Sequence, residues 1–160
     1  MSEIMHEEKA PHSAMIKAFF LGVLLLLVAA TVLSWTGIYE SSKDFEALPL
    51  VTAIVVFAYW SYFNMRFRIT TEGVEAVMVP FTHRVSYGEI TEVRVIDKIP
   101  WYVGWGLRIW MRRLAYVSMH KSAVAIDKKK GIFKTLVLTT ENPERFAEMI
   151  NQRMEQLSLS

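Results

Sequence analysis

The chain has 160 residues, of which 52% are hydrophobic, and it carries a formal net charge of +2 at pH 7. That length allows one modest domain beside a membrane anchor. The chain contains no cysteine, which excludes disulfides, thiol catalysis, iron–sulfur clusters and cysteine-ligated zinc. Residues 1–65 carry a net charge of −3 and residues 66–160 a net charge of +5, and a basic domain next to a membrane suits an anionic cytoplasmic leaflet.

The first long apolar run follows an N-terminal leader that we assign to residues 1–15. No charged residue lies between Ala18 and Tyr39. A bilayer core of about 30 Å needs about 20 helical residues, and lipid requires a helix because the backbone must bond internally. We therefore predict a transmembrane helix at about 16–37. A cleaved signal peptide is the alternative, and the long, glutamate-containing leader argues against it.

The second uncharged run predicts another transmembrane helix at about 47–65. Four aromatic residues crowd its end, and Arg66 and Arg68 follow at once. An aromatic belt followed by basic residues is typical of a helix that leaves a membrane. The alternative is a buried core helix, because this run is the shorter of the two.

Lysine and arginine near the helix ends predict the orientation. Lys9 and Lys17 precede the first apolar run, Lys43 is the only basic residue between the two runs, and two arginines follow the second. We expect both termini and the β-rich domain in the cytoplasm and the short loop outside. Neither apolar run, 18–39 or 47–65, contains a charged residue, which argues against a transporter acting alone. The spans are expected to anchor the protein and to present a docking surface for another protein or a second copy.

Beyond Arg66 the pattern alternates between apolar and polar residues, which predicts a β-rich domain over residues 66–160. Thr71-Glu72-Gly73 is a turn signal, with Gly73 able to take a positive φ, and joins two strands into a hairpin. The expected strands are 67–70, 74–79, 82–87, 90–96, 107–111, 115–119, 123–127 and 132–139, with a hairpin turn at 128–131. Short strands with regular turns indicate an antiparallel barrel or sandwich of about seven strands.

The end of the chain predicts an amphipathic helix at 142–157. Asn142 is a suitable N-cap, Pro143 suits the first helical position, and Glu144 favours the positive end of the helix dipole. Apolar residues recur at spacings of three and four and define one buried face. We expect that face to close one end or side of the barrel.

Residues 66–152 resemble a pleckstrin-homology (PH) domain, and specifically the PH-like domains of small bacterial and archaeal membrane proteins. The segments that carry the likeness are Phe67–Thr70 with Gly73-Val74, Arg84–Tyr87 with Glu89-Ile90, Gly104-Trp105-Gly106-Leu107-Arg108, and Thr139–Glu144. The resemblance implies an α+β fold behind a two-helix transmembrane hairpin. Most members of that family have no assigned activity, so the resemblance gives a fold rather than a function.

Lipid recognition is one function that the resemblance implies. Phosphoinositide-binding PH domains carry basic residues at the first hairpin, whereas the matching turn here, 70–73, is short and contains Glu72. The alternative anionic-lipid surface consists of Arg112, Arg113, Lys121, Lys128, Lys129 and Lys130. A solvated hairpin turn is the slightly better explanation of the three consecutive lysines.

The loop 100–106 is rich in tryptophan and glycine and is the candidate interface. Tryptophan and tyrosine bring large contact areas at low entropic cost. We expect Trp101 and Tyr102 to be exposed, in the headgroup region or against a partner's helices, and Trp105 to pack in the core. Arg108 and Trp110 complete the candidate interface.

No catalytic motif is present, and the four histidines lack the spacing of metal ligands. We therefore expect no enzyme, no cofactor and no small-molecule substrate. Nucleic acid has only the +5 charge in its favour. The expected function is a membrane-anchored scaffold or accessory subunit that uses its cytoplasmic domain for protein–protein interaction. The alternative is an anionic-lipid sensor that uses the basic hairpin.

Overall fold

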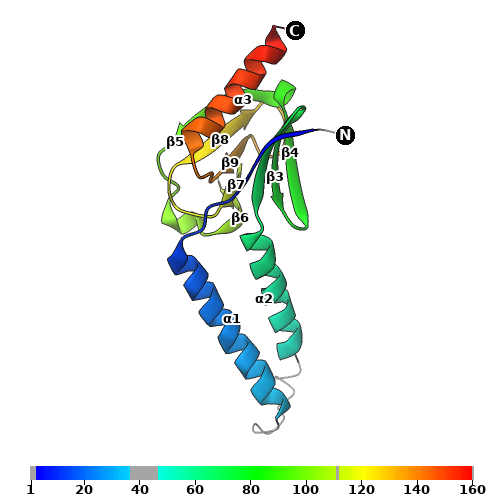
Figure 1. The fold of residues 1–160 in the computed structure, drawn as a ribbon, viewed down its shortest axis with the longest axis vertical. Coiled ribbons are helices and arrows are strands. Elements are labelled where there is room, and N and C mark those ends of the chain that lie inside the picture. Colours follow the sequence, from blue (N-terminus) through cyan, green and yellow to red (C-terminus); the bar gives the residue numbers. More distant parts are fainter. Residues whose placement is uncertain (1–2, 37–46, 111, 160) are drawn as a thin grey trace. The chain divides into compact units, whose positions relative to one another are not determined.

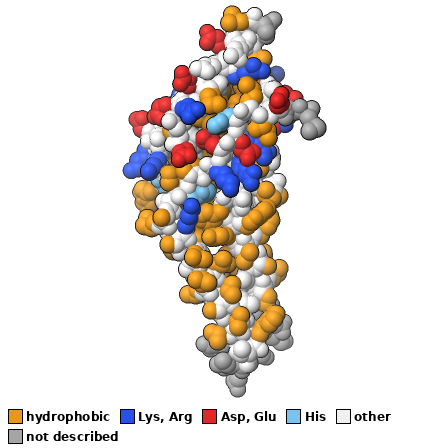
Figure 2. Space-filling model, viewed as in Figure 1, with side chains coloured by type: hydrophobic (Ala, Val, Ile, Leu, Met, Phe, Trp, Pro, Cys, Tyr) orange, Lys and Arg blue, Asp and Glu red, His pale blue; other side chains and the backbone are white. Residues whose placement is uncertain are grey.

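A computed structural model describes residues 3–36, 47–110 and 112–159, without the side chain of Trp110 (Figure 1). The chain divides into two compact units. One unit is helical and comprises His12–Phe63. The other is the β domain, which combines Met1–Pro11 with Asn64–Ser160. The helical unit is thus an insertion in the β domain. Charged side chains gather over the β domain, whereas the two inserted helices are covered by hydrophobic side chains (Figure 2).

The helical unit contains α1 (Ala14–Trp35) and α2 (Leu48–Phe63). Ser13 caps α1 by accepting a hydrogen bond of 3.2 Å from the backbone N–H of Ile16. The 22 residues of α1 are long and apolar enough to cross a membrane. The 16 residues of α2 extend about 24 Å at 1.5 Å per residue. The second helix is therefore shorter than the predicted 47–65, and among the described helices α1 alone reaches the length that a span ordinarily needs.

Within this unit, α1 and α2 pack against each other in an antiparallel arrangement. The hydroxyls of Thr31 and Thr52 are hydrogen-bonded at 2.8 Å. Near the other end, the ring of Phe20 lies 5.7 Å from that of Tyr62 and 6.1 Å from that of Phe63. The start of α1 thus lies beside the end of α2.

The first sheet of the β domain has the order β1-β2-β3-β4, and every pair is antiparallel. Its strands are β1 (Ile4–Lys9), β2 (Arg66–Thr70), β3 (Gly73–Met78) and β4 (Phe81–Ser86). The predicted hairpin is therefore confirmed. The assignment of residues 1–15 to a separate leader is wrong, because residues 4–9 form an edge strand beside β2. Edge strands that carry charge have little hydrophobic alternation to reveal them.

Gly73 has a different role from the one expected. Its φ angle is not in the left-handed region. A Cβ atom there would lie 2.1 Å from the carbonyl oxygen of Val85 on β4. The position therefore requires glycine because two strands approach closely.

The second sheet has the order β5-β8-β9-β7-β6. Its strands are β5 (Ile90–Ile96), β6 (Gly106–Trp110), β7 (Arg113–Val117), β8 (Ala123–Lys128) and β9 (Thr135–Leu138), and short 3₁₀ turns η2 (Tyr87–Glu89) and η3 (Trp101–Val103) precede β5 and β6. β7 and β9 pair in parallel, which corrects the expectation of an entirely antiparallel arrangement. The two sheets remain separate, so the described strands form no closed barrel.

The core has two layers, because both faces of the second sheet are buried. On one face Tyr116 of β7 meets Phe67 of the first sheet edge to face, with ring centroids 6.5 Å apart. On the opposite face, Ala115, Val117, Ala123, Ala125 and Val137 pack with Ile99 and Val103. The loop between β5 and β6 thus covers the face that the first sheet leaves free.

The C-terminal helix α3 (Pro143–Ser158) confirms the prediction of 142–157 to within one residue at each end. Asn142 caps it by accepting a hydrogen bond of 3.0 Å from the backbone N–H of Arg145. Phe146, Ala147 and Ile150 are buried, and the helix packs against β5 and β8. The domain is therefore α+β, with two sheets and one covering helix (Figure 1).

Candidate functional site

The chain leaves and re-enters the β domain at one place. The backbone N–H of Ala10 donates to the carbonyl of Met65 at 2.9 Å, and Lys9 is the register partner of Arg66. We call this place, with Pro11 and Asn64, the junction end of the β domain.

A small cavity of about 250 Å³ lies at the junction end. It is lined by Pro11, Met119, Lys121, Ser122, Thr139, Thr140 and Glu141. The hydroxyl of Thr139 bonds Ser118 at 2.7 Å and the carbonyl of Tyr116 at 3.0 Å. The hydroxyl of Thr140 is buried without a hydrogen-bond partner. The cavity is therefore lined by a lysine, a carboxylate and small polar side chains, while the Thr140 hydroxyl itself has almost no accessible surface.

The aromatic turn η3 is tied to the same end. The backbone N–H of Ile99 donates to the carbonyl of Lys121 at 3.2 Å. Trp101 is 81% exposed and Tyr102 is 61% exposed, and their rings lie 6.4 Å apart in an edge-to-face contact. The predicted exposure of these two side chains is confirmed, and the buried Ile99 and Val103 hold the turn in place.

Trp105 departs from its expected place in the core. It is 43% exposed, and its ring contacts that of His120 at 5.1 Å. The neighbouring Gly104 and Gly106 both have positive φ, at 77° and 83°, so the chain changes direction on each side of Trp105. The expectation that Trp105 packs in the core is therefore wrong, since its side chain lies partly outside the core.

The remaining interface candidates lie on β6. Arg108 is exposed, and a Cβ atom at Gly104 would come within 3.3 Å of its Nε. Trp110 ends the strand, and its side chain lies outside the described residues. Ile109, which the sequence did not single out, is 69% exposed. β6 is also an edge of its sheet, so this exposed apolar side chain stands on an edge strand.

The six residues of the predicted anionic-lipid surface do not gather in one place. Lys121 is at the junction end and precedes β8, whereas Lys128 is the last residue of β8 and is followed by Lys129 and Lys130. Five residue steps of strand separate Ala123 from Lys128, about 16 Å. Arg112 and Arg113 lie near the lysine hairpin. Arg113 is the register partner of Thr135, and the backbone N–H of Lys134 donates to the carbonyl of Arg112.

The lysine hairpin also has partners within the domain. Lys128 Nζ lies 3.1 Å from Nε2 of His83, and Lys129 Nζ donates to the carbonyl of Gly88 at 3.3 Å. Burial lowers the pKa of Lys128, opposed by the nearby Glu89. These lysines therefore connect the two sheets as well as facing solvent.

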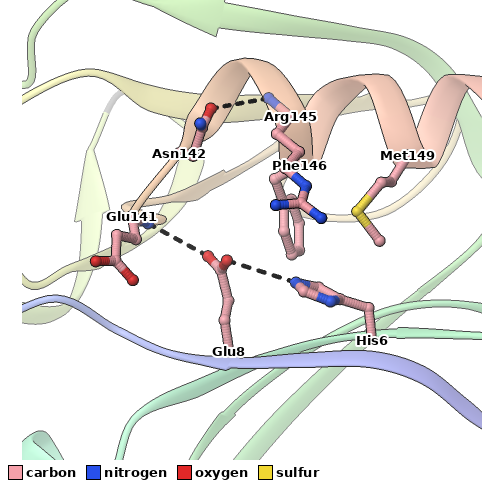
Figure 3. Close-up of a pocket in the computed structure, with 7 residues that line it drawn as sticks. All are labelled: His6, Glu8, Glu141, Asn142, Arg145, Phe146 and Met149. Carbon is pink, nitrogen blue, oxygen red and sulfur yellow. Dashed lines mark hydrogen bonds and ion pairs between the residues drawn. The ribbon is translucent and has the colours of Figure 1, made fainter.

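A larger cavity of about 440 Å³ lies between β1 and the start of α3 (Figure 3). Its lining residues are His6, Glu8, Glu141, Asn142, Arg145, Phe146 and Met149. Glu8 accepts a hydrogen bond of 3.4 Å from the backbone N–H of Glu141 and lies 3.6 Å from Nε2 of His6. Burial raises the pKa of Glu8, while these two contacts oppose the increase. An internal carboxylate thus fixes β1 to the start of the helix.

This cavity could not be predicted from the sequence, because it depends on the unpredicted strand β1. The burial of β1 alternates weakly, and only His6 and Glu8 point inward. Both are polar, so hydrophobic periodicity cannot detect them. Among the described residues, no group of three or more histidines and acidic residues could hold a metal ion.

Comparisons with known proteins identify no relative. No protein-family model matches the chain, and neither a curated protein nor a solved structure does.

Proposed function

We propose that the protein is a non-enzymatic scaffold or accessory subunit, whose PH-like domain is held at the cytoplasmic face of a membrane by a two-helix hairpin. The observation that carries this proposal is the pairing of β1 with β2. These neighbouring strands stand directly before and after the inserted helices. The β domain is therefore joined to the helical unit by two segments of the chain, one before α1 and one after α2, rather than by one flexible linker.

The same pairing supports a two-helix span. If α1 crosses the membrane, the chain must return to the side it left, because β2 pairs with β1. Only α2 is available for the return. Its 16 residues are short for a core of about 30 Å, but local thinning of the bilayer costs only fractions of a kcal/mol per Å of mismatch. Tyr62 and Phe63 at its end suit a membrane interface.

The likeness to PH domains is supported by two sheets and a C-terminal helix that covers β5 and β8. Such a fold carries many functions, so the site must supply the argument. The cavities of the β domain are small and of mixed charge. The open edge of β6 is a better candidate, since an exposed strand edge can pair with an extended segment of another chain.

We propose that this edge, with Arg108 and Ile109, binds the partner protein. Ile109 provides an apolar contact, and the backbone of β6 provides hydrogen bonds. The lysine hairpin is the weaker alternative, because it lies away from the junction end and two of its lysines are bonded within the domain. No described contact favours that hairpin as a lipid site.

The test is to extract the full chain gently from its own membrane and to determine by native mass spectrometry what remains bound. The variant Ile109→Lys should lose the partner, because lysine on a strand edge opposes further pairing. Ile132→Lys is the matched control, since Ile132 is 82% exposed but lies in the β8–β9 turn. A wild-type protein that is always a lone monomer would contradict the proposal. Equal loss of the bound partner in Ile109→Lys and Ile132→Lys would contradict it as well.

A further inference from the structure

The cavity between β1 and the start of α3 lies wholly within the β domain and does not involve the helical unit. Its volume of about 440 Å³ is within the usual range of small-molecule sites, about 300–1,000 Å³. His6 and Glu8 of β1 face Arg145 and the half-buried Met149 of α3 across it. The lining therefore combines charges of both signs with an apolar side chain.

The carboxylate of Glu8 is held in place by a contact to each of its oxygens. Oε1 accepts a hydrogen bond of 3.4 Å from the backbone N–H of Glu141, and Oε2 lies 3.6 Å from Nε2 of His6. The Glu8 side chain is still 17% exposed, so a ligand in the cavity can reach it. Because an ionised carboxylate has about four acceptor positions, Glu8 can accept further hydrogen bonds.

The charge of Glu8 is only partly compensated within the protein. Burial raises the pKa of Glu8, and the contacts with Glu141 N–H and His6 oppose that increase without cancelling it. The carboxylate of Glu141 lines the same cavity and adds a second negative charge. A ligand with an ammonium group would compensate these charges, whereas a simple anion would be repelled by them.

Arg145 supplies a positive charge to the same cavity. Its side chain is exposed and points from α3 toward β1 (Figure 3). Within the described part of the chain, no hydrogen bond or ion pair joins its guanidinium to another residue. A guanidinium presents two parallel N–H donors that match the two oxygens of a carboxylate. Arg145 is therefore available to bind a carboxylate that the protein itself does not provide.

The start of α3 does not provide the anion site. The backbone N–H of Glu141 already bonds Glu8, and the N–H of Arg145 bonds the side chain of Asn142 at 3.0 Å. The N–H of Phe146 donates to the carbonyl of Asn142, also at 3.0 Å. The guanidinium of Arg145, rather than these N–H groups, is the donor that remains for a ligand.

We propose that this cavity binds a free α-amino acid with an apolar side chain, as a ligand rather than as a substrate. Its ammonium group bonds Glu8, its carboxylate pairs with Arg145, and its side chain contacts Met149. The bound amino acid thus connects β1 to α3. This inference does not rest on the membrane anchoring, on the partner protein or on β6, so its failure would leave the proposed function intact.

The first experiment is isothermal titration calorimetry of the full chain in detergent with L-leucine, L-valine and L-phenylalanine. At least one of the three should bind. For that amino acid, the N-acetyl derivative lacks the ammonium group and the amide lacks the carboxylate, and each should bind at least about tenfold more weakly. Glycine, which lacks the side chain, should also bind more weakly. Absence of binding by all three amino acids, or equal binding of the N-acetyl derivative, would overturn the proposal.

The second experiment assigns the two charged groups. Arg145→Gln and Glu8→Gln should each raise the Kd of the amino acid about tenfold. Glu144→Gln is the matched control, because Glu144 is exposed beside Arg145 but does not line the cavity. Arg145→Gln should keep the Tm of the ligand-free wild type, since its guanidinium has no described partner, and so its loss of binding cannot be attributed to unfolding. An unchanged Kd in Arg145→Gln, or an equal loss in Glu144→Gln, would overturn the assignment.

Hydrogen exchange measured by mass spectrometry locates the bound ligand. Saturation with the amino acid should slow amide exchange in peptides from β1 and from residues 141–149, because the ligand connects these segments. Peptides from β6 provide the internal reference and should not change. Slower exchange in β6 without any change in β1 and residues 141–149 would place the ligand elsewhere and contradict the proposed site.

Discussion

Glu7 of β1 forms ion pairs with both Arg68 and Arg66 of β2, and the contact to Arg66 Nη1 is 3.1 Å long. The hydrogen bond from Arg68 is the largest cause that lowers the pKa of Glu7. These residues lie on opposite sides of the inserted helices in the sequence. Side chains thus add to the backbone pairing that makes residues 4–9 part of the domain.

A first prediction concerns the independence of the β domain. Replacing His12–Phe63 by a short glycine–serine linker should give a folded, soluble monomer, because Ala10 and Met65 are already hydrogen-bonded at 2.9 Å. Residues 64–160 alone should aggregate, since loss of β1 exposes the edge of β2. Size-exclusion chromatography and thermal unfolding by circular dichroism compare the two. Equal solubility and Tm would show that β1 is dispensable.

A second prediction tests the close approach of β3 and β4. Gly73→Ala should destabilise the protein by about 3 kcal/mol, because its Cβ would lie 2.1 Å from the carbonyl oxygen of Val85. Gly88→Ala is the matched control, since the nearest atom to its Cβ is Ser86 Oγ at 3.9 Å. Denaturant unfolding measures both changes. A similar loss in the two variants would contradict the packing described for Gly73.

The strands and the final helix illustrate which features local sequence can predict. The 67–70 and 74–79 hairpin and the helix at 142–157 follow from short-range signals, namely alternation, a turn and an N-cap. The parallel pairing of β7 with β9 could not be predicted in this way, because it depends on contacts between distant segments. β1 could not be predicted for the same reason, because it pairs with a strand that is distant in the sequence. Its inward-facing residues are also polar.

The candidate site also has some features that local sequence predicts and others that it does not. The exposure of Trp101 and Tyr102 could be predicted, because the turn that carries them is short and local. The expected basic surface could not be judged from sequence, since Lys121 and the lysine hairpin flank β8 at its two ends. Only the arrangement of the strands reveals that separation.

A third prediction concerns pH. Burial, followed by the charge of Lys128, lowers the pKa of His83 from 6.5, and the nearby Glu89 opposes this effect. The folded state therefore disfavours protonated His83. Its contribution to stability is complete above about pH 6.5 and is lost as the pH falls through the lower folded-state pKa. The raised pKa of Glu8 acts in the opposite direction, so comparison with a variant is needed.

The measurement is the Tm of the full chain between pH 7.5 and 5, for the wild type and for His83→Gln. The wild type should lose more stability on acidification than the variant does. The difference between the two curves isolates the share of His83, because Glu8 is present in both. Parallel curves would show that His83 does not link stability to pH.

A fourth prediction concerns the contact between α1 and α2. Thr31 donates to the carbonyl of Leu27 at 2.8 Å and bonds Thr52 across the helices. A double-mutant cycle of Thr31→Val and Thr52→Val should give a coupling of about 0.6 kcal/mol, the usual value for such bonds in membranes. Ser34→Ala is the control, since its hydroxyl donates within α1 to Thr31 at 2.7 Å. Additive effects of the two valines, measured by unfolding in detergent, would argue against the contact.

The proposed return of the chain through α2 is tested most directly by the accessibility of single cysteines in intact cells that express the protein. A membrane-impermeant maleimide should label Ser42→Cys, between the two helices, from outside the cell. It should label Glu3→Cys, immediately before β1, and Lys130→Cys, in the β8–β9 turn, only after permeabilisation. Labelling of Ser42→Cys and Lys130→Cys from the same side would contradict the two-helix hairpin and the anchoring of the domain that depends on it.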